Sequence, residues 1–343
     1  MIVKSAYIEI TNRCNLDCRD CYNGSGKNKK TVELDPEALM HFIKDLKLLY
    51  GVRAVVLSGG EPLLHTRIDE ILKSISEFCT QYQDMDFNII TNGTTDNALF
   101  YELMETDSHF SIQISLDGPN ESANASMRGP GNFTRVLANT GKRRFYNKPI
   151  YKMILNQKNA SFVEEYFHLI FDDLGGLPAF AFTSPQGNAV THWDEMALPV
   201  RERSDIILKI HHLYKEHDLD GLTLPLPTSC CDLTKADGEN SFCIRPDGSI
   251  QPCQNLYDAR FAVGNLYHCD WEDISRKISS LSSFLSSRFS CDYGCSKCPI
   301  RNTCGRGCPA ISYITAGDLL ASDGECELRK LSTFRMIKAS KIF

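Results

Sequence analysis

The chain has 343 residues, of which 42% are hydrophobic, and its formal net charge is −6. This acidic balance and the scattered lysines and arginines argue against a nucleic-acid partner. The apolar runs fall short of the ~18 residues that suggest a membrane-spanning helix. Glu9 interrupts the first apolar run, which therefore does not resemble a signal peptide. We expect a cytoplasmic protein that binds neither nucleic acid nor membrane.

Cysteine is the unusual component, with fifteen in the chain. Three lie within eight residues near the N-terminus, eleven lie beyond residue 229, and only Cys79 occupies the long middle. In a reducing compartment, such clustering indicates metal or redox chemistry rather than disulfide bonds. The odd total also fits poorly with a fully paired framework.

Short β-like runs alternate with longer amphipathic stretches over the first two hundred residues. Six such alternations predict a parallel sheet with right-handed crossovers, although periodicity does not decide between an open sheet and a barrel. The expected strands are Ser5–Ile10, Ala54–Ser58, Asp86–Ile90, Ser111–Leu116, Pro149–Leu155 and Pro178–Thr183, and the expected helices are Asp35–Tyr50, Arg67–Cys79, Ala98–Glu105, Asn132–Tyr146, Ser161–Leu174 and Glu202–Glu216.

Pro225 and Pro227 follow the last of these helices and lead into a region rich in cysteine, glycine and turn residues. Small units of this composition have little room for a core and usually depend on bound metal. The sequence therefore predicts two domains. Residues 1–226 form the first, including a bridging helix from about residue 200, and residues 227–343 form the second, which ends in a helix.

The N-terminal cysteines lie in the segment TNRCNLDCRDCY, where Cys14, Cys18 and Cys21 form a C-x3-C-x2-C pattern after the first strand. Three thiolates on one loop can bind three irons of a [4Fe–4S] cube and leave the fourth iron open. A zinc site is the alternative, but zinc usually takes four ligands and no histidine lies nearby in the sequence. The position after a strand favours an active site, because α/β proteins gather their chemistry at that edge.

This triplet resembles the cluster-binding motif of the radical S-adenosylmethionine (SAM) superfamily. The segment LSGGEPLLH resembles the family's GGE motif, which implies that Gly59, Gly60 and Glu61 lie at the methionine end of SAM. The segment ISLDG and a downstream arginine are similar to the family's carboxylate-binding pair, which implies Ser115 and Arg128.

Two further positions complete the expected cofactor pocket. Asn92, in the Thr91-Asn92-Gly93 segment that ends the third strand, is expected to shape it. The family usually carries an aromatic residue before the third cysteine, where this chain has Asp20 followed by Tyr22. We therefore count Tyr22 among the cofactor-binding residues, although this departure leaves the adenine contact open.

The C-terminal cysteines include the run CSKCPIRNTCGRGC, preceded by the G-x4-C unit at Gly248–Cys253. This combination resembles the SPASM domain, named from maturases of subtilosin, pyrroloquinoline quinone, anaerobic sulfatases and mycofactocin. A pair of zinc-ribbon-like sites is the alternative, because spacing alone does not identify a metal. The resemblance implies two auxiliary clusters, one on Cys295, Cys298, Cys304 and Cys326, and the other on Cys253, Cys308, Cys243 and either Cys230 or Cys231, of which we favour Cys231.

These resemblances together imply a partial (β/α)6 TIM-type barrel followed by a SPASM domain, with SAM and three [4Fe–4S] clusters as cofactors. They imply one-electron cleavage of SAM to a 5′-deoxyadenosyl radical, which abstracts hydrogen from the substrate. Cys291 is a candidate hydrogen donor, with a structural thiol as the plainer alternative. The expected substrate is a ribosomally made peptide that matures by cross-linking, thioether formation or epimerisation.

The expected electron source is an external one-electron reductant of the flavodoxin or ferredoxin type. With the first strand expected to start at about residue 5, we expect no winged-helix leader-recognition domain in this chain. Recognition of the precursor is then expected from the SPASM region or from a separate protein, or the substrate is a different one. The alternatives are an oxidase resembling anaerobic sulfatase maturases, a small-molecule dehydrogenase or decarboxylase, and a non-catalytic iron–sulfur electron carrier. A carrier has no need of a SAM pocket, which argues against it.

Overall fold

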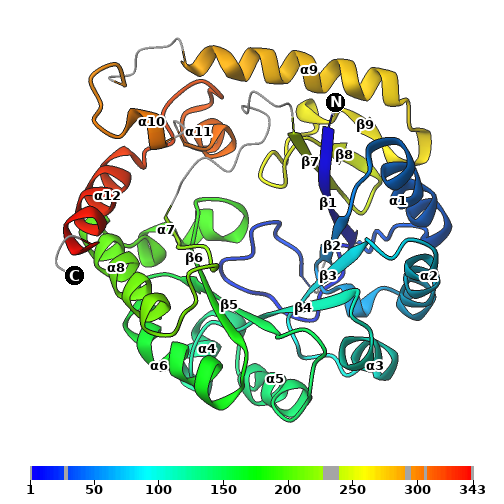
Figure 1. Ribbon diagram of the computed structural model, residues 1–343, viewed down its shortest axis with the longest axis horizontal. Helices are drawn as coiled ribbons and strands as arrows, with labels where there is room; N and C mark the ends of the chain where they lie inside the picture. The colour runs from blue at the N-terminus through cyan, green and yellow to red at the C-terminus, as the bar shows by residue number, and fades with distance from the viewer. Residues whose placement is uncertain (1, 27–29, 227–238, 290–294, 305–306, 341–343) are drawn as a thin grey trace.

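A curved parallel sheet forms the frame of the molecule. The computed structural model describes residues 2–26, 30–226, 239–289, 295–304 and 307–340. Six strands lie side by side in chain order, and Figure 1 shows them curving around a centre with helices on the outside. The six predicted strands are confirmed, and the curvature answers the question that periodicity left open. They are β1 (Ile2–Thr11), β2 (Ala54–Gly59), β3 (Asp86–Thr91), β4 (Phe110–Ser115), β5 (Ile150–Leu155) and β6 (Leu177–Phe182).

The outer helices begin and end close to the predicted positions. Helix α1 (Pro36–Tyr50) has Asp35 as its N-cap and ends at Gly51 in the left-handed region. The helix expected over 132–146 ends at Thr140, and the short helix α4 was not expected from its polar sequence. The remaining helices of this part are α2 (Ile68–Gln81), α3 (Ala98–Thr106), α4 (Glu121–Arg128), α5 (Asn132–Thr140), α6 (Val163–His168), α7 (Trp193–Met196) and α8 (Val200–Glu216).

The C-terminal region continues the same sheet. Strand β7 (Glu239–Ile244) pairs in parallel with β1, and β8 (Ser249–Gln251) and β9 (Gly264–Asn265) follow it antiparallel. Phe242 and Ile250 are buried in the common core, so this region shares the barrel's core to an extent that its composition did not predict. The boundary predicted at residue 227 begins a stretch outside the described residues and stays a prediction. The helices that follow are α9 (Trp271–Ser286), α10 (Arg301–Cys304), α11 (Pro309–Ala316) and α12 (Cys326–Ser340), of which α12 packs against α8.

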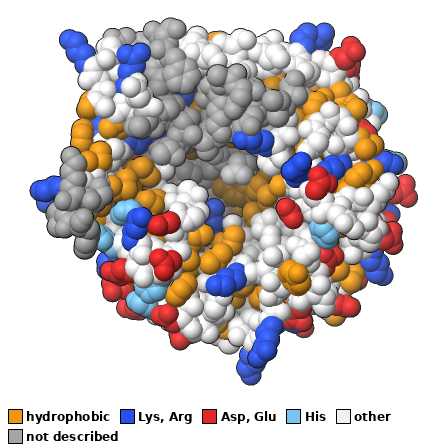
Figure 2. Space-filling model, viewed as in Figure 1, with side chains coloured by type: hydrophobic (Ala, Val, Ile, Leu, Met, Phe, Trp, Pro, Cys, Tyr) orange, Lys and Arg blue, Asp and Glu red, His pale blue; other side chains and the backbone are white. Residues whose placement is uncertain are grey.

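Side chains on β1 divide between the two faces of the sheet. Ala6, Ile8 and Ile10 are fully buried in the core cluster that includes the apolar residues of α1. Successive residues of a strand point to opposite faces, so Tyr7 and Glu9 face the inside of the curve. There the Tyr7 hydroxyl donates to Ser58 Oγ at 2.8 Å. The interior of the barrel is therefore polar where the chemistry is expected. In the view of Figure 2, the surface of the molecule is hollowed near its centre.

Along the described parts of the chain, no helix combines the length and hydropathy needed to cross a bilayer.

One buried ion pair is expected to contribute strongly to the stability of the C-terminal region. Asp323 and Arg329 form this pair, and both side chains are 2% exposed. We expect Asp323→Asn to lower the free energy of unfolding by about 3–5 kcal/mol, because it leaves the buried guanidinium without its carboxylate partner. Urea denaturation followed by circular dichroism measures the loss.

The matched control for that variant is Glu164→Gln, which removes the carboxylate of an exposed ion pair with Lys209. Exposed pairs contribute little, so we expect no measurable change. Equal losses in both variants would contradict the assignment of special stability to the buried pair.

Candidate active site

The three N-terminal cysteines lie on the loop that follows β1, and all three are half-buried. The backbone N–H of Leu16 approaches Cys14 Sγ at 3.4 Å, and Cys21 Sγ lies 3.1 Å from Asn23 Oδ1. Burial raises the pKa of Cys14 to about 11 and also raises the pKa values of Cys18 and Cys21. Metal binding requires thiolates, so cluster assembly here must release protons.

The glycines of the GGE segment press directly against this loop. Gly60 N donates to Thr11 O at 2.7 Å, and Glu61 N donates to Arg13 O at 2.8 Å. A Cβ atom on Gly59 would lie 2.2 Å from Thr11 O, and one on Gly60 would lie 2.3 Å from Arg13 O. These contacts exclude any side chain. Glycine is therefore required at positions 59 and 60 because the two loops pack closely here.

Glu61 braces the ends of β2 and β3 from a fully buried position. Its carboxylate accepts from the Thr91 hydroxyl at 2.7 Å and from the backbone N–H of Asn92 at 2.7 Å. Burial raises its pKa to about 7, although these hydrogen bonds act in the opposite direction. The Asn92 side chain lies 4.0 Å from Cys14 Sγ and donates to Asn15 Oδ1 at 2.9 Å. Both motifs are thereby tied to the cysteine loop.

Arg128, at the end of α4, brings a positive charge to the same loop. Its Nε lies 2.6 Å from Asp117 Oδ2, and its Nη1 lies 3.8 Å from Cys18 Sγ. Burial and the proximity of Asp117 raise the pKa of Asp20 to about 7, while Arg128 opposes the rise. Ser115 ends β4, two residues before Asp117. The structure thus brings Arg128 to the cysteine loop, with Asp117 as a partner that the sequence did not reveal, and it places Ser115 at the end of β4.

Tyr22 belongs to a network centred on Glu9, which is 2% exposed. The Glu9 carboxylate accepts from Tyr22 Oη at 2.7 Å, from Tyr257 Oη at 2.9 Å and from Arg245 Nη1 at 2.9 Å. The Arg245 guanidinium also stacks on the Tyr257 ring, 3.1 Å from its centroid. The Tyr22 hydroxyl is therefore hydrogen-bonded to Glu9 of β1. Sequence reasoning assigned no role in the site to Glu9, and its available signal was a carboxylate between Ile8 and Ile10.

A segment after β6 secures the cysteine loop from the other side. Asn188 donates its backbone N–H to Cys21 O and its side-chain amide to Cys18 O, both at 2.9 Å. Gly187 has φ of 58°, and a Cβ atom there would lie 2.1 Å from Cys21 O. Arg19, on the loop, pairs with Glu195 of α7 at 2.6 Å. Sequence reasoning missed this clamp, because its contacts join residues far apart in the chain.

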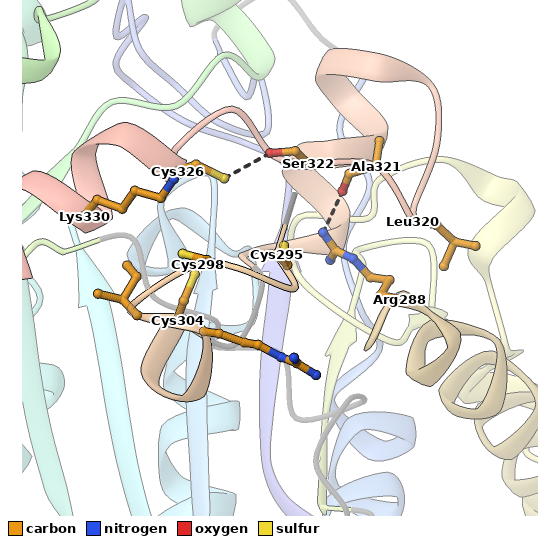
Figure 3. A pocket seen from close by; sticks show the side chains of 11 residues that line it. Arg288, Cys295, Cys298, Cys304, Leu320, Ala321, Ser322, Cys326 and Lys330 are labelled. Atoms are coloured by element: carbon orange, nitrogen blue, oxygen red, sulfur yellow. Dashed lines mark hydrogen bonds between the residues drawn. The ribbon is translucent and has the colours of Figure 1, made fainter. Parts of the chain in front are cut away.

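The cysteines expected to hold one auxiliary cluster line a single cavity of about 210 Å³. Figure 3 shows Cys295, Cys298, Cys304 and Cys326 around this space, with Lys330 beside it. Cys326 Sγ lies 3.5 Å from Ser322 Oγ. Four thiols around one cavity fit a [4Fe–4S] cluster, which takes four cysteine ligands.

The other expected set gathers around β7. Burial, with a smaller contribution from the neighbouring Cys308 thiol, raises the pKa of Cys253 to about 11. Cys243 is 1% exposed, and burial is the main cause of its raised pKa, with Glu9 and Cys253 contributing. These three cysteines therefore lie near one another. Cys230, Cys231 and Cys291 fall outside the described residues.

The spacing of the thiols bears on the zinc alternative. Within the described ranges, no three cysteine, histidine, aspartate or glutamate side chains gather as the ligands of a single metal ion. A zinc ion holds its thiolates about 2.3 Å from one centre, whereas a cube carries each cysteine on a different iron. The cavity of about 210 Å³ that the four C-terminal thiols line offers space for such a cube.

Comparison with known proteins agrees with this geometry. Residues 8–154 match the radical SAM superfamily. The chain is 27% identical over 325 residues to the antilisterial bacteriocin subtilosin biosynthesis protein AlbA of Bacillus subtilis (strain 168), a match that covers 88% of this chain and 66% of AlbA. It is 25% identical over 328 residues to the mycofactocin maturase MftC of Mycolicibacterium smegmatis, covering 93% of this chain and 81% of MftC.

A solved structure shows the same fold over the full length of the chain. Native anSMEcpe with bound AdoMet and Cp18Cys peptide superimposes with a TM-score of 0.74 at 18% identity, covering 100% of both chains. AdoMet is another name for SAM. At this level of identity the likeness establishes the fold alone.

The contacts of Gly187 and Asn188 with the cysteine loop predict that a methyl group added at position 187 disturbs the cysteines. We expect Gly187→Ala to displace the Cys21 carbonyl and to lower the iron bound after anaerobic reconstitution by roughly four atoms per chain, the content of one cluster. Iron analysis measures the change. Gly175→Ala is the control, because Gly175 has φ of 64° but nothing within 4 Å of the added Cβ.

Both variants carry the backbone cost of a left-handed alanine, about 1–3 kcal/mol. Only Gly187→Ala adds the collision with the loop. If both variants bind the same iron as the unchanged protein, the clamp does not position the cysteines.

Proposed function

We propose that the protein is a SPASM-type radical SAM enzyme that modifies a peptide substrate, because residues 8–154 match the radical SAM superfamily. The observation that carries the proposal is the convergence of the GGE segment, Asn92 and Arg128 on a loop with three cysteines. The peptide substrate is supported by the relatives, which are a subtilosin biosynthesis protein and a mycofactocin maturase. The reaction is maturation of a ribosomally made peptide by hydrogen abstraction.

The cysteine loop is the proposed site of the cluster that binds SAM. Cys14, Cys18 and Cys21 would hold a [4Fe–4S] cluster and leave one iron for SAM. The chemistry that this cluster and SAM supply when bound is one-electron cleavage to methionine and a 5′-deoxyadenosyl radical, which abstracts hydrogen from the substrate. The contribution of the protein is to orient these groups and to exclude water around them.

The surrounding residues take the SAM-binding roles. Gly59 and Gly60 shape the loop contact, Glu61 holds β2 and β3 together beside the methionine end, and Asn92 lies against the Cys14 thiol. Ser115 and Arg128 are the proposed contacts to the SAM carboxylate, and Tyr22 is the proposed aromatic wall near the adenine.

The Arg128 charge has a second consequence. The guanidinium lies close to Cys18 Sγ, and its pKa is raised because Asp117, Cys18 and Asp20 surround it. It stays positive at any accessible pH. It therefore offsets negative charge from the thiolates that cluster binding creates.

Two auxiliary clusters complete the proposal. One takes Cys295, Cys298, Cys304 and Cys326 around their shared cavity. The other takes Cys243, Cys253, Cys308 and either Cys230 or Cys231, with Cys231 preferred. Full ligation of both favours electron transfer or a structural role. Cys291 is proposed as a hydrogen donor.

The partners follow from the reaction. One-electron chemistry requires an external reductant of the flavodoxin or ferredoxin type, and precursor recognition falls to the SPASM region or to a separate leader-recognition protein. Reduced, metal-ready cysteines suit the cytoplasm, which is the proposed location.

The decisive experiment combines iron analysis with SAM cleavage. After anaerobic reconstitution, the protein should bind roughly twelve irons and form 5′-deoxyadenosine with SAM and dithionite. Changing Cys14, Cys18 and Cys21 together to alanine should remove roughly four irons and abolish 5′-deoxyadenosine, because the SAM-binding cluster is lost. Chromatography with mass detection measures the product.

The control is Cys79→Ala, which removes a buried thiol on α2 that is distant in sequence from both cysteine groups. It should keep full iron content and SAM cleavage. Bound zinc together with an absence of 5′-deoxyadenosine in the unchanged protein would defeat the proposed function.

A separate variant tests the auxiliary site in the C-terminal cavity. Cys298→Ala should lower the iron content by roughly four atoms while SAM cleavage continues, because the first cluster has its own ligands. Cys269→Ala, at a half-buried cysteine that does not line the cavity, should leave the iron unchanged. Equal iron in both variants would contradict the assigned ligand set.

A further inference from the structure

One lysine lies on the inner face of the barrel. Tyr151, Met153 and Leu155 of β5 are buried in the core cluster that also contains apolar residues of α6, and the Tyr151 hydroxyl donates to Thr140 Oγ1 of α5 at 3.0 Å. Successive residues of a strand point to opposite faces, so Lys152 points to the inside of the curve. Strands β2 to β6 lie wholly within the described residues, and no other inward-facing side chain on them is basic.

The strand register places Lys152 beside the residue expected to contact SAM on β4. Lys152 pairs with Ser115 of β4 on one side and with Ala179 of β6 on the other. Paired residues of neighbouring strands share a face of the sheet, so all three face inward. Ser115 is the proposed contact to the SAM carboxylate. The Lys152 side chain is half-buried, so its ammonium group is within reach of a molecule bound there.

The Lys152 ammonium lacks the carboxylate partner that the buried arginines of the site have. Arg128 Nε lies 2.6 Å from Asp117 Oδ2, and Arg245 Nη1 lies 2.9 Å from Glu9 Oε1. The Lys152 side chain forms no hydrogen bond or ion pair with any residue that the structure describes. Burial penalises its charged form and lowers its pKa. A carboxylate beside the ammonium would offset that penalty.

The roles already proposed for neighbouring residues narrow the source of that carboxylate. SAM carries one carboxylate, for which Ser115 and Arg128 are the proposed contacts. Lys152 lies on the next strand, so its charge remains for a second molecule. The proposed substrate is a peptide, and the anionic groups of an ordinary peptide are carboxylates. One ammonium group is a compact charge that balances one of them.

We propose that Lys152 is a specificity residue that binds the side-chain carboxylate of an aspartate or glutamate in the substrate. The inference rests on the proposed function, because it takes the substrate to be a peptide that binds beside SAM. It narrows that substrate to a peptide with an acidic residue near the residue that loses hydrogen. Lys152 positions this peptide and takes no part in breaking bonds.

The test compares two probes that differ in one charge. N-acetyl-glutamate α-N-methylamide carries a side-chain carboxylate, and N-acetyl-glutamine α-N-methylamide has the same shape without the charge. Ligand-observed NMR measures both affinities for the reconstituted full chain, saturated with SAM and kept without reductant. We expect the glutamate probe to bind roughly fivefold or more tightly, because a hydrogen bond between charged groups is stronger than a neutral one.

Two variants locate the preference at Lys152. Lys152→Met keeps a long unbranched side chain without the charge, and it should bring the two affinities to within about twofold of each other. Lys148→Met removes the same charge from an exposed position just before β5, and it should keep the preference. Because the Lys152 ammonium has no partner among the described residues, its loss should not lower the melting temperature, which circular dichroism follows.

The affinity for SAM separates the substrate from the cofactor as the source of the carboxylate. Lys152→Met should bind SAM within about twofold of the unchanged protein, because Ser115 and Arg128 remain. Equilibrium dialysis with labelled SAM measures this affinity. A preference that disappears when SAM is bound, together with roughly tenfold weaker SAM binding by Lys152→Met, would assign Lys152 to the cofactor and overturn the inference.

The remaining outcomes distinguish this inference from the proposed function. A protein that cleaves SAM but binds both probes equally overturns the role of Lys152 and leaves the proposed function standing. A preference for the glutamate probe that survives Lys152→Met also overturns that role. A protein that prefers the glutamate probe through Lys152 but forms no 5′-deoxyadenosine keeps the carboxylate site and overturns the proposed function.

Discussion

The buried pairing of Glu9 with Arg245 joins the two cysteine-bearing regions of the chain. The two residues are 236 positions apart, and their side chains are 3% and 7% exposed. Removing one member of such a pair typically costs about 3–5 kcal/mol, because the other charge stays buried and unpaired. Tyr22, one residue after the third cysteine, and Tyr257 bond to the same carboxylate. The β7–β8 hairpin and the cysteine loop are therefore held to the same carboxylate.

Close backbone contact is the second constraint on this loop. Gly59 and Gly60 press on it from β2, and Gly187 presses on it from the segment after β6. Each glycine leaves no room for a Cβ, so the loop is held between two surfaces. A site that must present three thiols in one geometry benefits from such support, since little reorganisation is then required on binding.

The inner face of β1, β7 and β8 connects the sites in space. Cys243 of β7 lies between Tyr7 of β1 and Gln251 of β8 in the strand register, and the cysteine loop follows the end of β1. The Tyr22 and Tyr257 hydroxyls and the Arg245 guanidinium gather on the Glu9 carboxylate at this face.

The sequence by itself determined the local elements and the residues capable of the chemistry. Alternating and helical periodicity located all six barrel strands within a few residues, and cysteine spacing identified the loop of Cys14, Cys18 and Cys21. These features are local, since a strand's periodicity or a loop's ligand pattern is written in consecutive residues. The early end of α5 at Thr140 was not visible in the same way.

The contacts between these elements were decided only by the tertiary structure. The pairing of β7 with β1, the Asn188 clamp and the direction of the Tyr22 hydroxyl all depend on partners distant in the sequence. A donor or acceptor in one segment does not specify which distant group will satisfy it. That choice is made when the whole sheet closes and buried polar groups find partners.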